Sequence, residues 1–427
     1  MTGGTGDTGA ADAPPRVVVT GLGASTPVGG DVATSWAALT AGRSGVRKIS
    51  TAWADELPVR IAGVAAEEPA ERLAPFEVRR LDRVQQFALT AAREAWADAG
   101  SPQPQPERFA VAVASGGGGL QALLHEYDVL RESGWQRVSP LTLPRYMANG
   151  SAAWLSIEFG ATAELHAPAS ACASGADALA RGVELIRTGR VDVVLAGGAE
   201  AMIHPVVVAG FAAMRALSRR NDDPERACRP FDATRDGFVL GEGAGVLVLE
   251  SAEHAERRGA RVYGELAGFG RSADAFHIAN PEPTGAGTAV AVARALADAG
   301  MDPADVAHVN AHATGTPQGD AAESAALRSA LGPAAEFVSV TSTKSMTGHL
   351  LGAGGAVEAV ATVLTLHHGV VPPTLNLETP EGAAGLDVVR GAARELPRRP
   401  AGALSNSFAF GGQNVSLAFR RSASAAG

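Results

Sequence analysis

The feature of this sequence that most constrains its fold is a regular alternation of short apolar strands with helical patterns. Apolar runs at residues 16–20, 109–115 and 191–196 are each followed directly by glycine, and a similar series begins again near residue 261. Chains that alternate strands with helices form mixed sheets covered by helices. The pattern therefore predicts an α/β protein built from two similar halves, 16–260 and 261–421. Further strands are expected at residues 246–249, 262–267, 306–311, 337–341, 403–407 and 415–420, and helices at 32–41, 83–99, 285–300 and from 355 to about 368.

Composition narrows the class of protein. The 427 residues are 46% hydrophobic and only 19% charged, which is enough apolar sequence for a large core. The net charge of -9 argues against nucleic acid as the main partner. No stretch approaches the roughly 18 uninterrupted apolar residues of a membrane span, so we expect no membrane insertion.

The N-terminal residues and the cysteine count indicate where such a protein works. Residues 1–15 lack the basic and apolar regions of a signal peptide, and their composition predicts a disordered tail. The two cysteines, Cys172 and Cys228, are too few for a disulfide framework and fit a reducing compartment. We therefore expect a cytoplasmic protein.

One of these cysteines lies in a distinctive setting. Small residues surround Cys172 in the segment Ala-Ser-Ala-Cys-Ala-Ser-Gly at 169–175, and apolar residues with helical spacing follow it. Cys172 should therefore stand at the start of a helix, where free N–H groups and peptide dipoles lower a thiol pKa. Since the thiolate is the nucleophilic form, this position suits covalent catalysis. The alternative is that Cys172 is a small, buried apolar residue.

Two histidine segments favour the catalytic interpretation. His312 lies within Asn-Ala-His-Ala-Thr-Gly-Thr-Pro-Gln-Gly-Asp at 310–320, and His349 lies within Thr-Lys-Ser-Met-Thr-Gly-His-Leu-Leu-Gly at 343–352. Each segment follows an expected strand and precedes an expected helix, where α/β proteins place chemistry. Zinc held by Cys172 and the two histidines is the competing interpretation. No closely spaced ligand pair is present, so we expect no metal.

Three other patterns have structural interpretations. The glycines at 116–119 follow a strand but lack the Gly-Lys-Ser/Thr of a phosphate-binding loop, so they indicate close backbone packing. The glycine cluster at 241–245 leads into a strand rather than a helix, which argues against nucleotide binding. Asp320 and Glu323 have the spacing of a capping box and are expected to open a helix.

The cysteine and histidine segments, together with three further motifs, carry a family resemblance. These motifs are Arg-Pro-Phe-Asp at 229–232, Arg-Asp-Gly-Phe-Val-Leu-Gly-Glu-Gly-Ala-Gly at 235–245, and Asn-Ser-Phe-Ala-Phe-Gly-Gly-Gln-Asn at 406–414. In this combination the chain resembles the β-ketoacyl-acyl carrier protein synthases from about residue 16 to residue 420. It is most similar to the elongating condensing enzyme of bacterial type II fatty acid synthesis, in its actinobacterial form. The resemblance implies a thiolase fold of five αβαβα layers and a homodimer.

The resemblance also implies a mechanism. Cys172 would take an acyl group from acyl carrier protein as a thioester, and malonyl-acyl carrier protein would then lose carbon dioxide and attack it. His312 and His349 would donate hydrogen bonds to the malonyl thioester oxygen, where enolate charge develops. The backbone N–H groups of Cys172 and Phe410 would form an oxyanion hole for acyl transfer. No cofactor is needed, and the remaining implied site residues are Lys344, paired with Glu358, and Asp320 as structural support.

Two departures from the family pattern bear on the substrate. Gly117 stands where elongating relatives usually carry a bulky residue that gates the acyl pocket. Because glycine leaves space, we expect acceptance of long or rigid unsaturated chains, unless a bulky neighbour such as Phe211 fills the gap. In the gating loop beside Phe410, Ala409 replaces a glycine and Gln413 replaces a threonine or histidine. Alanine narrows the backbone freedom of a loop that should swing.

The expected partner is acyl carrier protein in its acyl and malonyl forms. Carrier proteins are acidic and this chain is net acidic too, so docking requires a local basic patch. The alternative for any one arginine is an ordinary solvated side chain. The basic positions that match those of the family are Arg79, Arg80, Arg137 and Arg215.

Three alternatives to a fatty acid enzyme can be compared with these residues. The nearest is the ketosynthase of a type II polyketide pathway, such as a polyene pathway, in a heterodimer with a chain-length factor. Chain-length factors lack the nucleophile, so Cys172 excludes that role for this subunit. A degradative thiolase would carry a second cysteine near the C-terminus, where this chain has none. A non-catalytic scaffold would not need Cys172 together with both histidines. The sequence therefore leaves two roles open, fatty acid synthesis and polyketide synthesis.

Overall fold

The computed structural model describes residues 14–383, 385–397 and 402–422. The tail predicted over residues 1–15 lies outside the described residues as far as residue 13. The strands are β1 (Val17–Ser25), β2 (Val46–Lys48), β3 (Ile61–Gly63), β4 (Phe109–Ala114), β5 (Leu165–His166), β6 (Val193–Glu200), β7 (Gly243–Ser251), β8 (Gly264–Ala273), β9 (Val306–Asn310), β10 (Ser339–Thr341), β11 (Val370–Val371), β12 (Asp387–Val388), β13 (Arg394–Glu395), β14 (Gly402–Phe408) and β15 (Gln413–Arg421). The α-helices are α1 (Val32–Thr40), α2 (Pro75–Arg80), α3 (Arg83–Asp98), α4 (Leu120–Ser133), α5 (Thr142–Tyr146), α6 (Gly150–Phe159), α7 (Ser174–Arg187), α8 (Pro205–Ala213), α9 (Ala252–Arg257), α10 (Ala286–Ala299), α11 (Pro317–Leu331), α12 (Lys344–Thr347) and α13 (Gly354–His368).

A mixed sheet runs through both halves of the chain. Among the described residues, eleven strands join in the order β12-β10-β9-β14-β15-β8-β1-β7-β6-β4-β5. Parallel pairs such as β4–β6 and β9–β14 occur beside antiparallel pairs such as β6–β7 and β14–β15. The two halves meet only briefly, where Val18 and Val19 of β1 face Glu265 and Gly264 of β8. The predicted mixed α/β architecture is therefore present.

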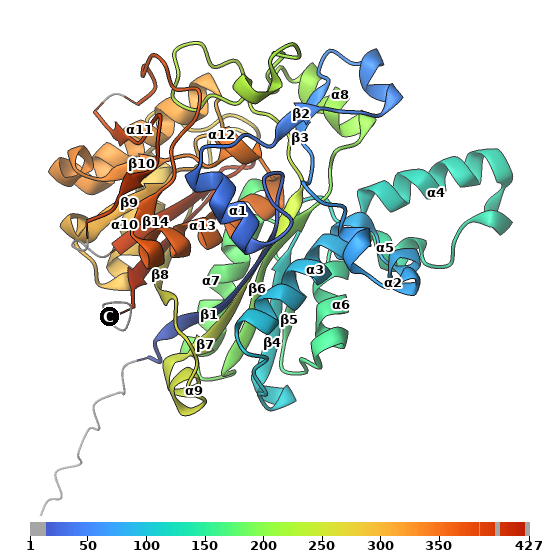
Figure 1. Ribbon diagram of the computed structural model, residues 1–427, viewed down its shortest axis with the longest axis horizontal. Coiled ribbons are helices and arrows are strands. Elements are labelled where there is room, and N and C mark those ends of the chain that lie inside the picture. The colour runs from blue at the N-terminus through green and yellow to red at the C-terminus, as the bar shows by residue number, and fades with distance from the viewer. Residues whose placement is uncertain (1–13, 384, 398–401, 423–427) are drawn as a thin grey trace, which may run out of the picture.

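Two central helices separate the halves of this sheet (Figure 1). Helix α7 packs on β4 and β6 from one half and on β8 and β15 from the other, and α13 packs on both β7 and β14. Helices α3 and α6 cover the outer face of the N-terminal half, while α10, with α11 against it, covers the C-terminal half. The resulting order is helix, sheet, helix, sheet, helix, which is the five-layered thiolase fold.

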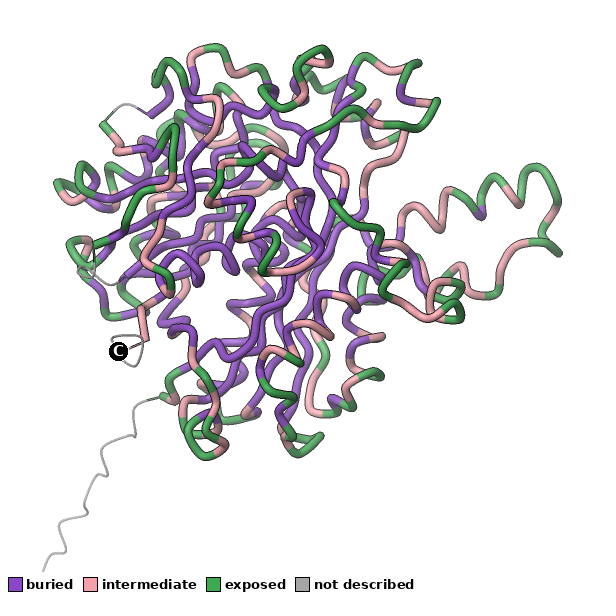
Figure 2. Tube along the Cα trace, in the orientation of Figure 1, coloured by how far each residue is buried: buried purple, intermediate pink, exposed green. Residues whose placement is uncertain are grey.

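The central helices are buried because apolar and small residues cover them almost completely. All residues of α13 from Gly354 to Leu366 are buried, and the central strands are buried with them (Figure 2). Small residues also let backbones approach closely. A Cβ on Gly245 of β7 would lie 2.6 Å from the backbone nitrogen of Val357, so only glycine fits there. This packing fixes the starts of α7 and α13 relative to each other.

One segment projects from the body of the molecule (Figure 1). It consists of α4, the 3-10 turn η4 (Trp135–Arg137) and α5, and we call it the arm. The arm exposes large apolar side chains, including Trp135 at 73% and Leu143 at 69% of their surface. Apolar side chains gathered in this way are typical of a surface that binds another protein.

Candidate active site

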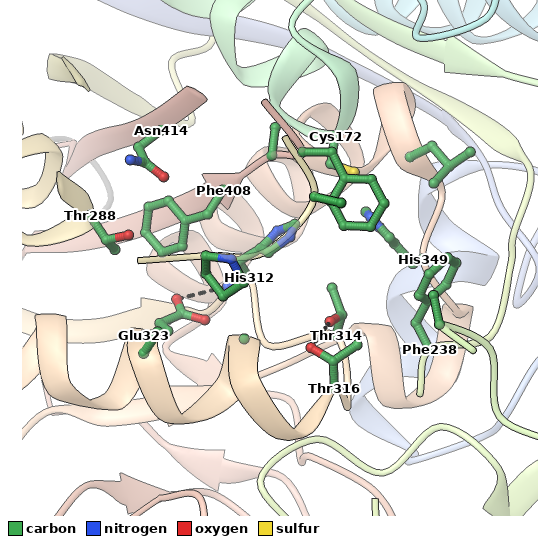
Figure 3. Close-up of a pocket in the computed structure, with 18 of the residues that line it drawn as sticks. Cys172, Phe238, Thr288, His312, Thr314, Thr316, Glu323, His349, Phe408 and Asn414 are labelled. Carbon is green, nitrogen blue, oxygen red and sulfur yellow. Dashed lines mark hydrogen bonds between the residues drawn. The ribbon is translucent and has the colours of Figure 1, made fainter. Parts of the chain in front are cut away.

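Cys172 lies on a tight turn at the entry to the central helix α7. The turn is η5 (Ala171–Ala173), and Ala171 adopts a left-handed φ of +48°, which is uncommon for a residue other than glycine. The Ser174 hydroxyl closes the turn, since it donates to the Ala171 carbonyl at 2.7 Å. The helix predicted after the cysteine is present, and Cys172 faces the cavity drawn in Figure 3.

The thiol pKa differs from the sequence expectation. Burial raises the pKa of the Cys172 thiol to about 11, although the backbone N–H groups of Phe410 and Cys172 and the charge of Lys344 oppose the rise. The prediction of a lowered thiol pKa is wrong because it rested only on the start of the helix. The apolar side chains around the sulfur exclude water, and this disfavours the thiolate. At neutral pH the Cys172 side chain is thus a thiol, with the N–H groups of Phe410 and of Cys172 itself as hydrogen-bond donors to its sulfur.

His312 is held by a carboxylate that the sequence pattern assigned to a helix cap. Helix α11 begins at Pro317, so Asp320 and Glu323 lie inside the helix and the predicted capping box is wrong. The buried Glu323 carboxylate instead accepts the N–H groups of His312 at 2.9 Å and Ala313 at 2.7 Å. Glu323 is therefore a site residue whose spacing in the sequence indicated only a local role.

His349 reaches the same cavity from the loop after α12. Its N–H donates to the Val239 carbonyl at 2.7 Å. The centroids of the His312 and His349 rings lie 5.3 Å apart, with the rings nearly perpendicular at 87° (Figure 3). Burial, reinforced by the charge of Lys344, lowers the pKa of both imidazoles well below the usual value, so both are neutral at pH 7. Within the described part of the chain, neither Nδ1 atom has a hydrogen-bond partner.

A buried ion pair lies behind the histidines. Lys344 begins α12, and its ammonium contacts the carboxylate of Glu358 on α13. Only 1% of the Lys344 side chain and 4% of the Glu358 side chain are exposed. The pairing expected from the resemblance is thus present. A single buried charge is costly, so the loss of either side chain would leave the other without its buried partner.

The segment between β14 and β15 borders the opening of the cavity. Ala409 and Phe410 line the cavity, and the Phe410 ring lies 6.4 Å from that of Phe211. The turn closes with a hydrogen bond of 2.8 Å from the Ala409 N–H to the Gln413 carbonyl. Its left-handed φ values fall on the glycines at 411 and 412, at +87° and +74°. Ala409 therefore occupies a position that the turn does not reserve for glycine.

Comparison with known proteins agrees with this arrangement. The family "Beta-ketoacyl synthase, N-terminal domain" matches residues 15–255, and "Beta-ketoacyl synthase, C-terminal domain" matches residues 263–378. The chain belongs to the β-ketoacyl synthase family. It is 44% identical to 3-oxoacyl-[acyl-carrier-protein] synthase 2 of Mycobacterium tuberculosis (strain ATCC 25618 / H37Rv), over 95% of this chain and 97% of the relative. This membership makes the chain a condensing acyltransferase.

Two solved structures extend the likeness to the whole fold. A β-ketoacyl synthase from Burkholderia phymatum STM815 superposes with a TM-score of 0.87 at 39% identity and covers 96% of this chain and 100% of that one. A type II PKS acyl-carrier protein in complex with its ketosynthase, bound to the hexaketide, matches with a TM-score of 0.86 at 34% identity. That match covers 96% of this chain and 100% of the other.

The space expected at Gly117 of this synthase is not open. A Cβ atom on Gly117 would lie 2.4 Å from the sulfur of Met202, so the methionine already fills the gap. Gly117 is not among the residues that line the cavity at Cys172. The predicted opening is therefore wrong, and Phe211, the bulky neighbour considered as an alternative, is not the side chain that fills it. Nothing in the local sequence around Gly117 indicated Met202, since the two positions lie on different segments.

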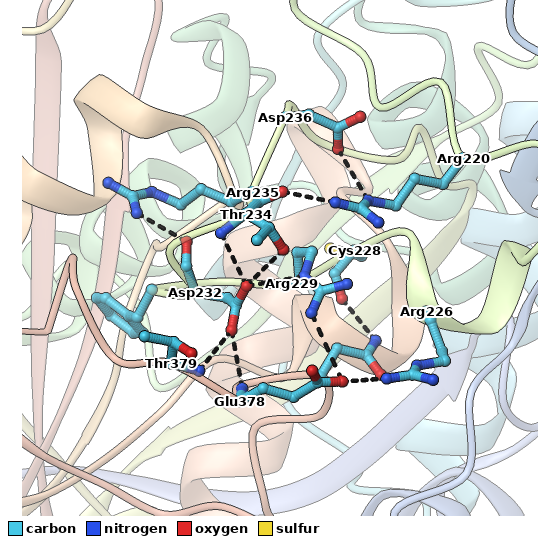
Figure 4. Close-up of polar contacts among 12 residues, drawn as sticks. Arg220, Arg226, Cys228, Arg229, Asp232, Thr234, Arg235, Asp236, Glu378 and Thr379 are labelled. Atoms are coloured by element: carbon cyan, nitrogen blue, oxygen red, sulfur yellow. Dashed lines mark hydrogen bonds and ion pairs between the residues drawn. The ribbon is translucent and has the colours of Figure 1, made fainter.

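The arginine and aspartate motif of the family has a structural role (Figure 4). The buried Asp232 pairs with Arg229 at 3.1 Å and accepts the N–H groups of Glu378 at 2.8 Å and Thr379 at 2.9 Å. Burial disfavours its charge, but these hydrogen bonds outweigh burial and hold the pKa of Asp232 well below the usual value. The network ties the loop at 226–236 to the segment that follows α13.

Asp320 supports the same loop from helix α11. Its carboxylate accepts the N–H groups of Phe231 at 2.7 Å and Gly315 at 3.1 Å, and lies 3.6 Å from Arg235. Phe231 has a left-handed φ of +64°, a conformation that needs such external support. The structural role expected for Asp320 therefore agrees with its contacts.

The four arginines expected to bind carrier protein are all exposed. Arg79 and Arg80 end α2, and Arg215 follows α8 next to Ala216, which lines the cavity. Arg137 belongs to η4 on the arm, which projects away from the body of its own chain (Figure 1). Three of the arginines thus lie on the body of the chain, and the fourth does not.

Two other kinds of site are absent from the described part of the chain. In residues 14–383, 385–397 and 402–422, no group of three histidine, cysteine or acidic residues could hold a metal ion. Over the same ranges, no helix is both long and apolar enough to cross a membrane.

Proposed function

We propose that the chain elongates fatty acyl groups bound to acyl carrier protein, with Cys172 as the nucleophile. The observation that supports this most is the convergence of the Cys172 and Phe410 N–H groups on the Cys172 sulfur, beside two neutral histidines. An acyl carbonyl on that sulfur would have its oxygen near donors that stabilise a tetrahedral oxyanion. The name of the 44% identical relative supports carrier-bound substrates.

The reaction has two stages. The Cys172 sulfur displaces the carrier thiol from an acyl thioester, and the thiol proton passes to the departing sulfur. Malonyl-acyl carrier protein then loses carbon dioxide, and the electrons of the broken C–C bond form an enolate. The enolate carbon attacks the acyl carbonyl, the C–S bond to Cys172 breaks, and the sulfur regains a proton. No cofactor takes part, because decarboxylation drives the condensation.

His312 and His349 are the proposed donors to the enolate oxygen. A neutral imidazole can donate one N–H, and two converging donors suit an oxygen whose charge grows during decarboxylation. The charge of Lys344 helps to keep both rings neutral, and Glu358 is the buried partner of Lys344. Lys344 therefore acts through the histidines rather than on the substrate.

Mass spectrometry tests the nucleophile. After incubation with acyl-acyl carrier protein, the wild-type chain should gain one acyl group, located at Cys172 by peptide mapping. The Cys172→Ala variant should gain none. Cys228→Ala is the matched control and should be acylated normally, because Cys228 is fully buried and burial raises its pKa to about 12. Acylation at Cys228 would overturn the assignment.

Release of carbon dioxide from malonyl-acyl carrier protein tests the histidines. His312→Ala and His349→Ala should each lower the rate by about two orders of magnitude, the usual effect of removing an oxyanion donor. The control is His277→Ala, a histidine of an exposed loop, which should leave the rate unchanged. A near-normal rate in either active-site variant would remove that residue from the mechanism.

A ketosynthase of a type II polyketide pathway is the second candidate. The observation that favours it is the TM-score of 0.86 with the structure of the type II PKS ketosynthase complex. Identity there is 34%, against 44% to the 3-oxoacyl-[acyl-carrier-protein] synthase 2. Carrier proteins loaded with saturated, unsaturated or poly-β-keto chains separate the two. A kcat/KM that is highest for saturated chains supports the fatty acid role.

We also propose that the chain forms a homodimer through the arm and the edge of the sheet. Strand β5 ends the strand order and pairs only with β4 in the described residues, so its outer edge is available for a second copy. The exposed Trp135 and Leu143 add apolar area. Light scattering after gel filtration should give a dimer, and Trp135→Glu with Leu143→Glu should give a monomer. A monomeric wild type that dimerises only with a chain-length factor would support the polyketide alternative.

Three further parts of the proposal follow from charge, cysteine state and chain organisation. Arg79, Arg80 and Arg215 bind the acidic carrier protein that serves the cavity of their own chain. Arg137, on the arm, binds the carrier protein that serves the cavity of the partner subunit. Both cysteines are free thiols, which supports a cytoplasmic location. The halves 16–260 and 261–421 are two repeats of one plan, the first carrying Cys172 and the second both catalytic histidines.

A further inference from the structure

The side chain of Met202 closes an apolar region next to the proposed nucleophile. Met202 comes two residues after β6, and its thioether lies over Gly117, where a Cβ would be 2.4 Å from Sδ and 2.7 Å from Cε. Met202 packs against the same apolar cluster as Cys172, a cluster that includes Val208 and Phe238. The gap at Gly117 is therefore filled by a side chain rather than by backbone.

The backbone on both sides of this contact is fixed by one buried carboxylate. Glu200 is fully buried and accepts the N–H groups of Gly116 at 2.8 Å and Gly117 at 3.2 Å. It also accepts the Ser115 hydroxyl at 3.0 Å and the Gly352 N–H at 3.0 Å. The glycine loop and the end of β6 are thus tied together. What remains free to move is the methionine side chain, which is unbranched and has three rotatable bonds.

The open cavity has apolar side chains near Cys172, from Phe211, Phe238 and Leu351, but polar side chains lie among its other walls. On the side of His312 and His349, the cavity carries Asp274, Thr288 and Glu323, which do not suit a hydrocarbon. Further apolar side chains near Cys172 lie outside this lining, in the cluster that contains Met202 and Val207. A long hydrocarbon chain that extends toward this cluster would meet the Met202 thioether, which lies over Gly117.

We propose that Met202 determines the length of acyl chain that this enzyme accepts on Cys172. The inference rests on the proposed acylation of Cys172. Short chains fit beside Met202 in its present position, and longer chains displace the thioether across Gly117. Gly117 provides the space into which the methionine packs, so the two residues together set the volume of the site. A change at either one should alter chain-length preference without altering decarboxylation.

Competition among saturated acyl-acyl carrier proteins of increasing length tests the proposal, with acyl-Cys172 identified by intact mass. Met202→Ala removes three heavy atoms, and each additional methylene accommodated is worth about a fourfold gain in relative kcat/KM. The preferred chain should therefore lengthen by about two to three carbons. Gly117→Ala presses on the thioether from the opposite side and should favour shorter chains. Gly117 does not have a left-handed φ, so a side chain is compatible with its backbone.

Two controls make the outcome decisive. The double variant Gly117→Ile with Met202→Ala adds a side chain at position 117 and removes most of the one at position 202, so the same space is filled from the other residue. Its chain-length preference should return toward that of the wild type. Met214→Ala, at an exposed methionine, should leave the preference unchanged. The same chain-length preference in wild type, Met202→Ala and Gly117→Ala would overturn the inference. Failure of wild-type Cys172 to accept any acyl group would instead overturn the proposed function.

Discussion

Removal of one member of the Lys344–Glu358 pair should destabilise the protein far more than removal of both. Glu358→Leu leaves the Lys344 ammonium buried without a counter-charge, and Lys344→Met leaves the Glu358 carboxylate in the same state. The side chains are only 1% and 4% exposed, so water cannot replace the lost partner. Each single variant should lose about 3–5 kcal/mol of unfolding free energy, the usual cost of breaking a buried pair.

The double variant Lys344→Met with Glu358→Leu removes both charges and keeps most of the volume. It should lose about 1 kcal/mol or less, because apolar replacements of buried pairs are often neutral. The interaction energy from the double-mutant cycle is the sum of the two single losses minus the double loss, and should then be about 5 kcal/mol or more. Urea unfolding at one fixed protein concentration, followed by circular dichroism, measures all four forms.

A second readout separates the electrostatic role of Lys344 from its structural role. The charge of Lys344 helps to lower the pKa of both His312 and His349, so Lys344→Met should raise both pKa values in an NMR titration. An exposed ion pair would behave differently: each single variant would lose less than about 1 kcal/mol of unfolding free energy, and the two losses would add in the double variant. That result would refute the argument from burial.

Three further predictions concern the thiol, the docking surface and the arginine–aspartate network. The rate of Cys172 alkylation by iodoacetamide should rise about tenfold per pH unit through neutral and mildly alkaline pH, because only the thiolate reacts and the pKa of the thiol is about 11. A rate that reaches a plateau near neutral pH would contradict the raised pKa. Changing Arg79, Arg80 and Arg215 to glutamate should raise KM for acyl carrier protein and weaken its dependence on salt, and an unchanged KM would mean that the carrier docks elsewhere. Asp232→Asn should lose about 3 kcal/mol or more at neutral pH. Since the pKa of Asp232 is lowered in the folded protein, the stabilisation by its charge is present above about pH 4 and is lost as the pH falls. In urea unfolding, the stabilities of the wild type and of Asp232→Asn should therefore converge in acid. Equal stability of the two proteins at neutral pH would contradict this role.

The sequence by itself determined the layered architecture and the three segments that meet at the site. Strand and helix patterns depend on neighbouring residues, so the predicted helix at 83–99 appears as α3 at Arg83–Asp98. His312 and His349 were each expected in a loop after a strand, and Cys172 at the start of a helix, because such local features depend on neighbouring residues. The family resemblance then assigned the three residues to one site. The glycines at 116–119 likewise indicated close backbone packing.

Tertiary structure decided the properties that depend on what packs against a residue. Glu323 has the spacing of a helix cap, whereas its carboxylate binds the backbone of the preceding His312 loop. The Cys172 pKa rises because distant segments exclude water from the sulfur, an effect that the start of a helix does not reveal. Gly117 suggested a gap that Met202 fills from another segment. Local sequence specifies backbone conformation, but burial and the filling of space come from residues that only the folded chain brings together.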